Sequence, residues 1–326
     1  MGWWQVDADT LARGRFVISP LAEATSSLKL LLRRAPASHP GEHAWLAAHL
    51  PAFQDLLRAD PLVPLLLEAA FRPRWNADFI TPTPSADGER TFVQELAVMR
   101  ATPPERVHDD LAFALGGPPP PALCRPDLAD RAADVLDWVW QRTVLPQWPL
   151  RRRVLEADIV ARTAQLSRGG WAAALEDMRP GMRWLGGDRL QINTQEYAPR
   201  EASGARLLFV PVSFDTSWVS WEGGHRYAVV YPCAGALAEP GRPPAPEALG
   251  QLLGRGRAAV LVLLDAPLST THLVALTGLP LGSVGRHLKV LLDARLVRRR
   301  RAGRSVLYYR TGAGDVLVNS QTEEAE

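Results

Sequence analysis

The residues best suited to hold another molecule lie in the last quarter of this 326-residue chain, where basic side chains are concentrated. A guanidinium group can bind a phosphate through two parallel hydrogen bonds, so clustered arginines favour a polyanionic partner. The side chains that could meet the phosphates and base edges of double-stranded DNA are Ser283, Arg286, His287, Lys289, Arg298, Arg299, Arg300, Arg301 and Arg304.

The distribution of charge supports the same partner. Residues 247–316 hold eleven Lys and Arg against four Asp and Glu, a net charge of +7, whereas the whole chain carries only +2. Residues 1–246 have 26 basic against 28 acidic side chains, a net charge of −2. A local excess of this kind attracts a polyanion to one part of the molecule.

These side chains are expected on a helix followed by a hairpin. Ser269 is a suitable N-cap for a first helix, and Gly278 and Pro280 predict the turn after it. In a second helix over 281–294, apolar residues recur at the spacing of one buried face, at Val284, Leu288, Leu291 and Leu292. The polar side chains then lie on the exposed face, and two strands over 296–310 carry the arginines.

The run VGRHLKVLLDARLV at 284–297, followed by an Arg-rich hairpin that ends in LYYR, resembles the winged helix-turn-helix of ArsR-type bacterial repressors. The resemblance covers about residues 245–312. It implies a homodimeric transcriptional repressor that reads a palindromic operator, with the recognition helix at 281–294 and a basic wing at 296–310. Gly285 stands where this family usually has Ser, and Arg295 where it often has Gly.

Metal-sensing members of that family hold thiolates in the helix before the recognition helix. The corresponding segment here, THLVALTG at 271–278, contains no cysteine and a single histidine, His272. The two cysteines, Cys124 and Cys233, lie elsewhere in the sequence. We therefore expect a regulator that does not sense metal and needs neither a metal nor a cofactor.

The rest of the chain is predicted to be mainly α-helical, which makes the whole an α+β protein. Residues 1–233 are expected to form a regulatory domain of helices with a small antiparallel sheet near 188–232. A Pro- and Gly-rich linker at 234–246, the DNA-binding domain at 247–316 and an acidic tail at 317–326 follow. The segment DTLARGRFVISPLAE at 9–23 resembles the start of an actinobacterial domain of unknown function found upstream of such winged helices.

An effector site is the least defined part of the prediction. Trp218, Trp221 and His225 lie in or beside the predicted sheet and are the best candidates for binding a small-molecule effector, although aromatic side chains at such positions also pack in cores. A protein effector is the alternative.

Several classes of protein are disfavoured. We find no HExxH, GxSxG, Walker or dinucleotide-binding pattern, so no catalytic residues are expected. No apolar run approaches the roughly 20 residues of a membrane span. The two cysteines are too few for a framework of disulfides, which suits the reducing cytoplasm. Two alternatives stay open: a protein-interaction module, or an architectural DNA binder that acts without a ligand.

Overall fold

The computed structural model describes residues 2–33, 40–73, 75–175, 178–194, 197–233, 245–264, 267–302 and 305–319. It divides into two compact units, one formed from residues 1–148 and 175–232, the other from 149–174 and 233–326. The second unit thus includes 149–174, a segment that the sequence analysis assigned to the N-terminal domain. Residues 234–244 of the predicted linker and 320–326 of the predicted tail lie outside the described residues.

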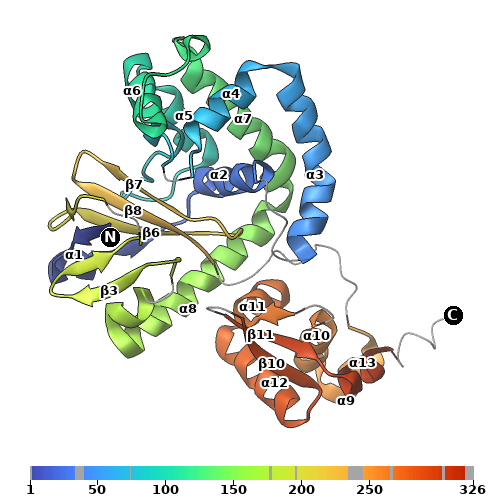
Figure 1. Ribbon diagram of the computed structural model, residues 1–326. Coiled ribbons are helices and arrows are strands. Elements are labelled where there is room, and N and C mark those ends of the chain that lie inside the picture. The colour runs from blue at the N-terminus through green and yellow to red at the C-terminus, as the bar shows by residue number, and fades with distance from the viewer. Residues whose placement is uncertain are drawn as a thin grey trace. The chain divides into compact units, whose positions relative to one another are not determined.

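Helices account for most of the regular secondary structure of the first unit. They are α1 Ala8–Ala12, α2 Pro20–Leu31, α3 Pro40–Ala59, α4 Leu62–Ala70, α5 Phe92–Arg100, α6 Pro104–Leu115 and α7 Leu128–Val139, with short helical turns η1 Asp78–Ile80, η2 Pro121–Leu123, η3 Trp140–Val144 and η4 Leu145–Gln147. The core helix is α2, which contacts α3, α5, α7 and the sheet strand β6 (Figure 1). Every residue of α2 except Lys29 is buried, as expected for a helix surrounded on all sides.

The start of α2 explains why a helix forms there. Ser19 is the N-cap, and its Oγ accepts a hydrogen bond from the backbone N–H of Ala22 at 3.0 Å. Pro20 occupies the first helical position, where the missing N–H costs nothing and the fixed φ suits the helix. The carboxylate of Glu95 on α5 accepts the N–H of Leu21 at 2.8 Å, so α5 holds the N-terminus of α2 in place.

Two four-stranded sheets complete the first unit. One has the order β3-β4-β1-β5, with β1 Trp3–Gln5, β3 Arg183–Gly186, β4 Arg189–Gln191 and β5 Arg200–Glu201. The other has the order β2-β6-β8-β7, with β2 Arg15–Phe16, β6 Arg206–Val212, β7 Trp218–Glu222 and β8 Arg226–Pro232. An α+β class with small sheets is therefore confirmed.

The prediction of one small antiparallel sheet near 188–232 was wrong, because these strands belong to two sheets and each sheet contains parallel pairs, such as β1 with β5 in the first. In the second sheet, strands β2 and β6 pair in parallel, as do β6 and β8, and only β7 runs antiparallel to its neighbour. Residues 207–212 and 227–232 are buried without interruption, the pattern of strands covered on both faces, which parallel pairing accompanies. On one face, Ala22 of α2 packs with Leu208, Val210, Trp218 and Val230.

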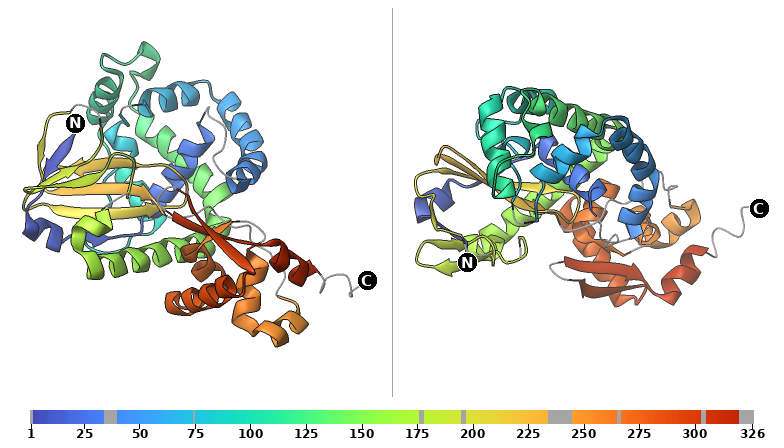
Figure 2. Two further views of the ribbon diagram at one scale, coloured as in Figure 1. Left: turned by 60° about the horizontal axis from the view of Figure 1, so that its bottom comes forward. Right: turned by 45° about the horizontal axis from the view of Figure 1, so that its top comes forward.

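The second unit combines helices with one small sheet. Its elements are most of α8 Trp148–Leu175, then α9 Glu247–Leu253, α10 Arg255–Leu263, β9 Leu268–Ser269, α11 Thr270–Thr277, α12 Leu281–Asp293, β10 Val297–Ala302, β11 Ser305–Arg310 and α13 Gly312–Asn319. The three strands are antiparallel in the order β10-β11-β9. Figure 2 shows β10 and β11 as a narrow two-stranded ribbon. Over the described ranges, no helix combines the length and the apolarity needed to cross a membrane.

Candidate nucleic-acid interface

The turn between α11 and α12 is fixed by local chemistry. Gly278 ends α11 with φ 68°, in the left-handed region that glycine adopts without strain, and its N–H donates to the carbonyl of Val274 at 2.9 Å. The Oγ1 of Thr277 accepts the N–H of Leu279 at 3.3 Å. Pro280 then caps α12 through its carbonyl, which accepts the N–H of Ser283 at 2.8 Å.

The two faces of α12 are sharply different. Val284, Leu288 and Leu291 are buried in the apolar core of the second unit, at most 2% exposed. Arg286 and Lys289 point away from that core and are exposed. The predicted helix and its inward residues are thus confirmed, and the exposed face carries two cations.

Two of the predicted contact residues on this helix are less exposed than Arg286 and Lys289. Ser283 is half-buried, and its Oγ accepts a hydrogen bond from Nη2 of Arg286 at 3.4 Å. His287 is also half-buried: a Cβ added at Gly256 of α10 would lie 2.5 Å from its Nε2, so its ring packs directly on that backbone. Burial and the nearby charges of Arg257 and Arg286 lower the pKa of His287, which favours its neutral form.

The end of α12 closes in a Schellman motif. The N–H of Arg295 donates to the carbonyl of Leu292 at 2.9 Å, and the N–H of Leu296 donates to that of Leu291 at 3.0 Å. Arg295 occupies the left-handed position of the motif with φ 57°. Its carbonyl accepts the hydroxyl of Thr311 at 2.8 Å, which ties the end of the helix to the segment after the hairpin.

Pairing of β10 with β11 distributes the arginines over both faces of the hairpin. Arg298 is opposite Tyr309 and Arg299 is opposite Tyr308, while Arg300 and Arg301 follow in alternation. Tyr308 packs against the core, and the guanidinium of Arg298 lies 5.5 Å from the ring centre of Tyr309. The arginines from 298 to 301 are all exposed.

Two further arginines of the hairpin differ from these four. Arg310 is only 11% exposed and pairs with Asp315 at 2.9 Å, so it stabilises the base of the hairpin. Arg304 lies outside the described residues. Within those residues, Arg286, Lys289, Arg299 and Arg300 form no ion pair with a carboxylate, which leaves their charges available to a ligand.

The three residues predicted for effector binding do not form one site. Trp218 is 6% exposed and faces α2, whereas Trp221, three positions along β7, lies on the opposite face. The guanidinium of Arg200 lies 3.6 Å from the ring centre of Trp221, and Trp75 meets Trp221 edge to face at a ring-centre distance of 5.3 Å. His225 is exposed in the turn between β7 and β8.

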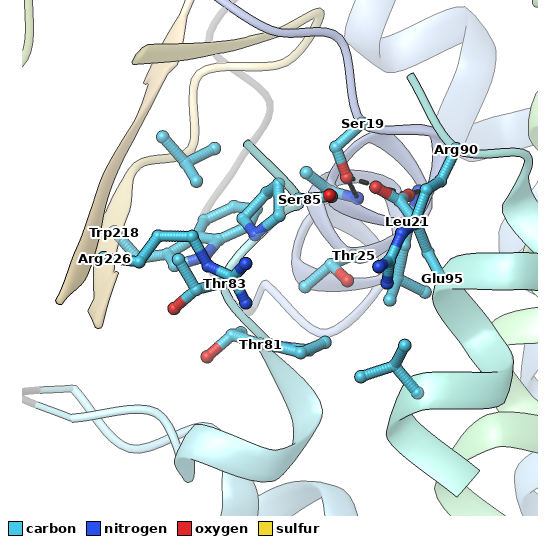
Figure 3. Close-up of a pocket in the computed structure, with 15 residues that line it drawn as sticks. Ser19, Leu21, Thr25, Thr81, Thr83, Ser85, Arg90, Glu95, Trp218 and Arg226 are labelled. Carbon is cyan, nitrogen blue, oxygen red and sulfur yellow. Dashed lines mark hydrogen bonds between the residues drawn. The ribbon is translucent and has the colours of Figure 1, made fainter. Parts of the chain in front are cut away.

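A hollow beside α2 contains Trp218 but otherwise consists of residues that the sequence did not single out. It is open to solvent, and the space between its walls, counted together with that open side, is about 470 Å³; we call it the α2 hollow. The side chains that define its chemistry are Ser19, Thr25, Arg90, Glu95, Trp218 and Arg226. In Figure 3, Arg226, Trp218 and Thr83 lie on one side of it, Arg90, Glu95 and Leu21 on the other, with Thr25 between them and Thr81 below.

Glu95 is the buried acid of the α2 hollow. Its Oε2 accepts hydrogen bonds from the Oγ of Ser19 at 2.9 Å and from the N–H of Leu21. Burial raises its pKa to about 7, although these hydrogen bonds and the charge of Arg90 act in the opposite direction. No signal in the sequence joins Glu95 to Arg226, because they are 131 positions apart and meet only through tertiary packing.

Across the described part of the chain, no group of three or more His, Cys, Asp or Glu side chains is placed to hold a metal ion. Comparison with models of protein families, with curated proteins and with solved structures finds no match to this chain. The assignment of function therefore depends on the geometry and charge described above.

Proposed function

We propose that this chain is a DNA-binding transcriptional repressor of the ArsR type, with a winged helix-turn-helix formed by α11, α12 and the β10–β11 hairpin, and that it acts in the bacterial cytoplasm without sensing metal. The observation that carries the proposal is the exposed basic face of α12 beside a hairpin with four consecutive exposed arginines. Metals and cofactors have no part in it.

The dimensions of α12 suit the major groove. Its 13 residues span about 20 Å, and the groove is about 12 Å wide, enough for one helix. Arg286 is exposed in the first half of the helix, where a helix-turn-helix contacts bases. A guanidinium there can donate two hydrogen bonds to the O6 and N7 of a guanine, the commonest specific contact.

The hairpin supplies binding energy of a different kind. Arg299 and Arg301 project from one face of the ribbon, Arg298 and Arg300 from the other, so both sides of a groove are within reach of cations. Contacts of this type go mainly to phosphates, and they depend strongly on salt but little on sequence. Together, α12 would specify the site and the hairpin would strengthen binding.

We expect a homodimer because the DNA-contacting surface of a single copy is small. One recognition helix rarely supplies enough specificity, and two copies read half-sites about 34 Å apart. Leu252 on α9 is 66% exposed and Val316 on α13 is 69% exposed, and the proposed dimer places its contact at these apolar side chains. Substitution of both by Glu is expected to shift the sedimentation coefficient to that of a monomer.

DNA binding can be tested with the upstream region of the gene that encodes this chain. We expect the full chain to bind one site there, and Arg286→Ala to weaken that site by about 1–3 kcal/mol while affecting other sequences little. Arg300→Ala is expected to weaken all sequences alike and to reduce the slope of log K against log salt by about 0.9.

Arg58→Ala is the matched control, because Arg58 is an exposed arginine on α3 of the first unit. It should leave both the affinity and the slope unchanged. Absence of DNA binding at low salt, in a sample that sediments as a dimer, would refute the proposal and would favour a protein-interaction module. Binding of all sequences with one affinity would instead indicate an architectural DNA binder.

A further inference from the structure

The lining of the α2 hollow carries two guanidinium groups, those of Arg90 and Arg226, and one carboxyl group, that of Glu95. The charge of Arg90 and that of Arg206, which lies outside the lining, both lower the pKa of Arg226. Arg226 pairs with Glu222 and Arg206 pairs with Asp87. Arg90 forms no hydrogen bond or ion pair with any described residue, so its guanidinium is available to a ligand.

Arg226 is also incompletely satisfied. Its Nε is buried and makes no hydrogen bond, and burial is the largest cause of its lowered pKa. A buried N–H without an acceptor is unfavourable, so an acceptor that reached it after a movement of the side chain would stabilise the bound state. Arg90 and Arg226 lie on opposite sides of the α2 hollow, which makes an anion between them the natural occupant (Figure 3).

The remaining lining indicates the shape of that anion. Trp218 presents an aromatic wall, and Val98, Leu21 and Val230 add apolar surface. Hydroxyls of Ser19, Thr25 and the loop 81–85 provide neutral hydrogen-bonding groups. A few polar groups on an otherwise apolar wall is the usual composition of a site for a small organic molecule.

Glu95 limits the charge that the occupant can carry. Its carboxyl shares the α2 hollow, and burial favours its protonated form. A protonated Glu95 tolerates a neighbouring monoanion, whereas a phosphate carries up to two charges and is less well neutralised here, because Arg226 already pairs with Glu222.

We propose that the α2 hollow binds a small planar carboxylate, whose charged group is held by Arg90 and Arg226 and whose apolar body lies against Trp218. The lining residues all belong to the first unit, and the proposal is tested independently of the proposed function. Of the three residues that the sequence suggested for effector binding, it retains Trp218 alone.

The test uses 4-fluorobenzoate as the probe and the full chain as the receptor. Broadening of its fluorine NMR signal is measured over a range of protein concentrations, and benzoate is then added as a competitor. We expect saturable binding that benzoate displaces. Benzamide, a neutral molecule of the same shape, and acetate, a carboxylate without the ring, are expected to displace at least tenfold less well, because one lacks the charge and the other the apolar body.

Two variants locate the site. Arg90→Ala is expected to weaken 4-fluorobenzoate binding about tenfold or more, the loss typical of a charge-assisted hydrogen bond. Arg206→Ala is the control, because Arg206 is 61% exposed and is not part of the lining; it should retain binding. Folding of both variants is checked by near-ultraviolet circular dichroism, and Arg90→Lys, which keeps the charge, should bind between the two.

Four results would overturn the proposal. The first is absence of saturable binding at millimolar probe concentration. The second is equal displacement by benzamide and benzoate, which would make the charge irrelevant. The third is an unchanged affinity in Arg90→Ala, which would place the probe elsewhere on the protein. Displacement by phenyl phosphate more effectively than by benzoate would assign the site to phosphates and so contradict the carboxylate.

Discussion

Arg295 provides a quantitative test of how α12 ends. Its φ of 57° places a side chain with a Cβ in the left-handed region, at a cost of about 1–2 kcal/mol. Replacing it with glycine removes that cost, but the unfolded chain gains freedom worth about 0.5–1 kcal/mol. The side chain is exposed, and the hydrogen bonds of the Schellman motif involve only backbone. Arg295→Gly is therefore expected to stabilise the second unit by about 0.5–1 kcal/mol.

Amide hydrogen exchange is the suitable assay, because the chain has two units and a single unfolding transition is not assured. Peptides that cover 281–297 should exchange about two to five times more slowly in the variant, the factor that corresponds to 0.5–1 kcal/mol.

Arg295→Ala removes the same charge but keeps the Cβ, so it should give no such protection. Equal protection in the Ala and Gly variants would mean that relief of charge repulsion is responsible. Faster exchange in the Gly variant would refute the argument from backbone strain.

Three other substitutions test the packing and the buried acid. The stability of the first unit should fall by about 3 kcal/mol between pH 4.5 and about 7, because the pKa of Glu95 is 4.5 in the unfolded chain and about 7 in the folded one, although the charge of Arg90 lowers the folded value. The urea midpoint, followed by tryptophan fluorescence, should lose this pH dependence in Glu95→Gln. Parallel pH profiles of the variant and the unchanged chain would contradict the prediction. Leu288→Ala should destabilise the second unit by about 2–5 kcal/mol in hydrogen exchange, since Leu288 is 2% exposed in its core, and a loss below 1 kcal/mol would contradict that packing. Gly314→Ala should lower stability by about 1–3 kcal/mol by the same assay, because its Cβ would lie 2.3 Å from the carbonyl oxygen of Leu296, and an unaffected variant would argue against that close approach.

Local patterns predicted α12 and the hairpin well. The spacing of Val284, Leu288 and Leu291 identifies the buried face without knowledge of its partners, because a helix repeats every 3.6 residues. Alternation and the pair of tyrosines similarly identify β11. These elements interact mostly with neighbours in sequence, so their own residues contain most of the information.

Arrangements that depend on distant segments could not be read in this way. The continuous apolar run of β6 indicates burial on both faces, but it does not name β2 and β8 as its parallel partners. The α2 hollow combines Ser19, Arg90 and Arg226, which no periodicity connects. His287 was predicted on the exposed face of α12, but its ring packs on Gly256 of another helix and is half-buried. The exposed face of α12 is therefore narrower than predicted.

The position of β1 and β2 within their sheets bears on how the protein can be made. Trp4 of β1 pairs with Leu190 and Arg200, and Phe16 of β2 pairs with Phe209, so the first strands lack their partners until nearly 200 further residues have been synthesised. Contacts that join such distant positions form slowly. During that interval the nascent N-terminal segment therefore exposes β1 and β2 without their partner strands, together with uncovered apolar surface. Chaperones would act on this chain during translation rather than after it.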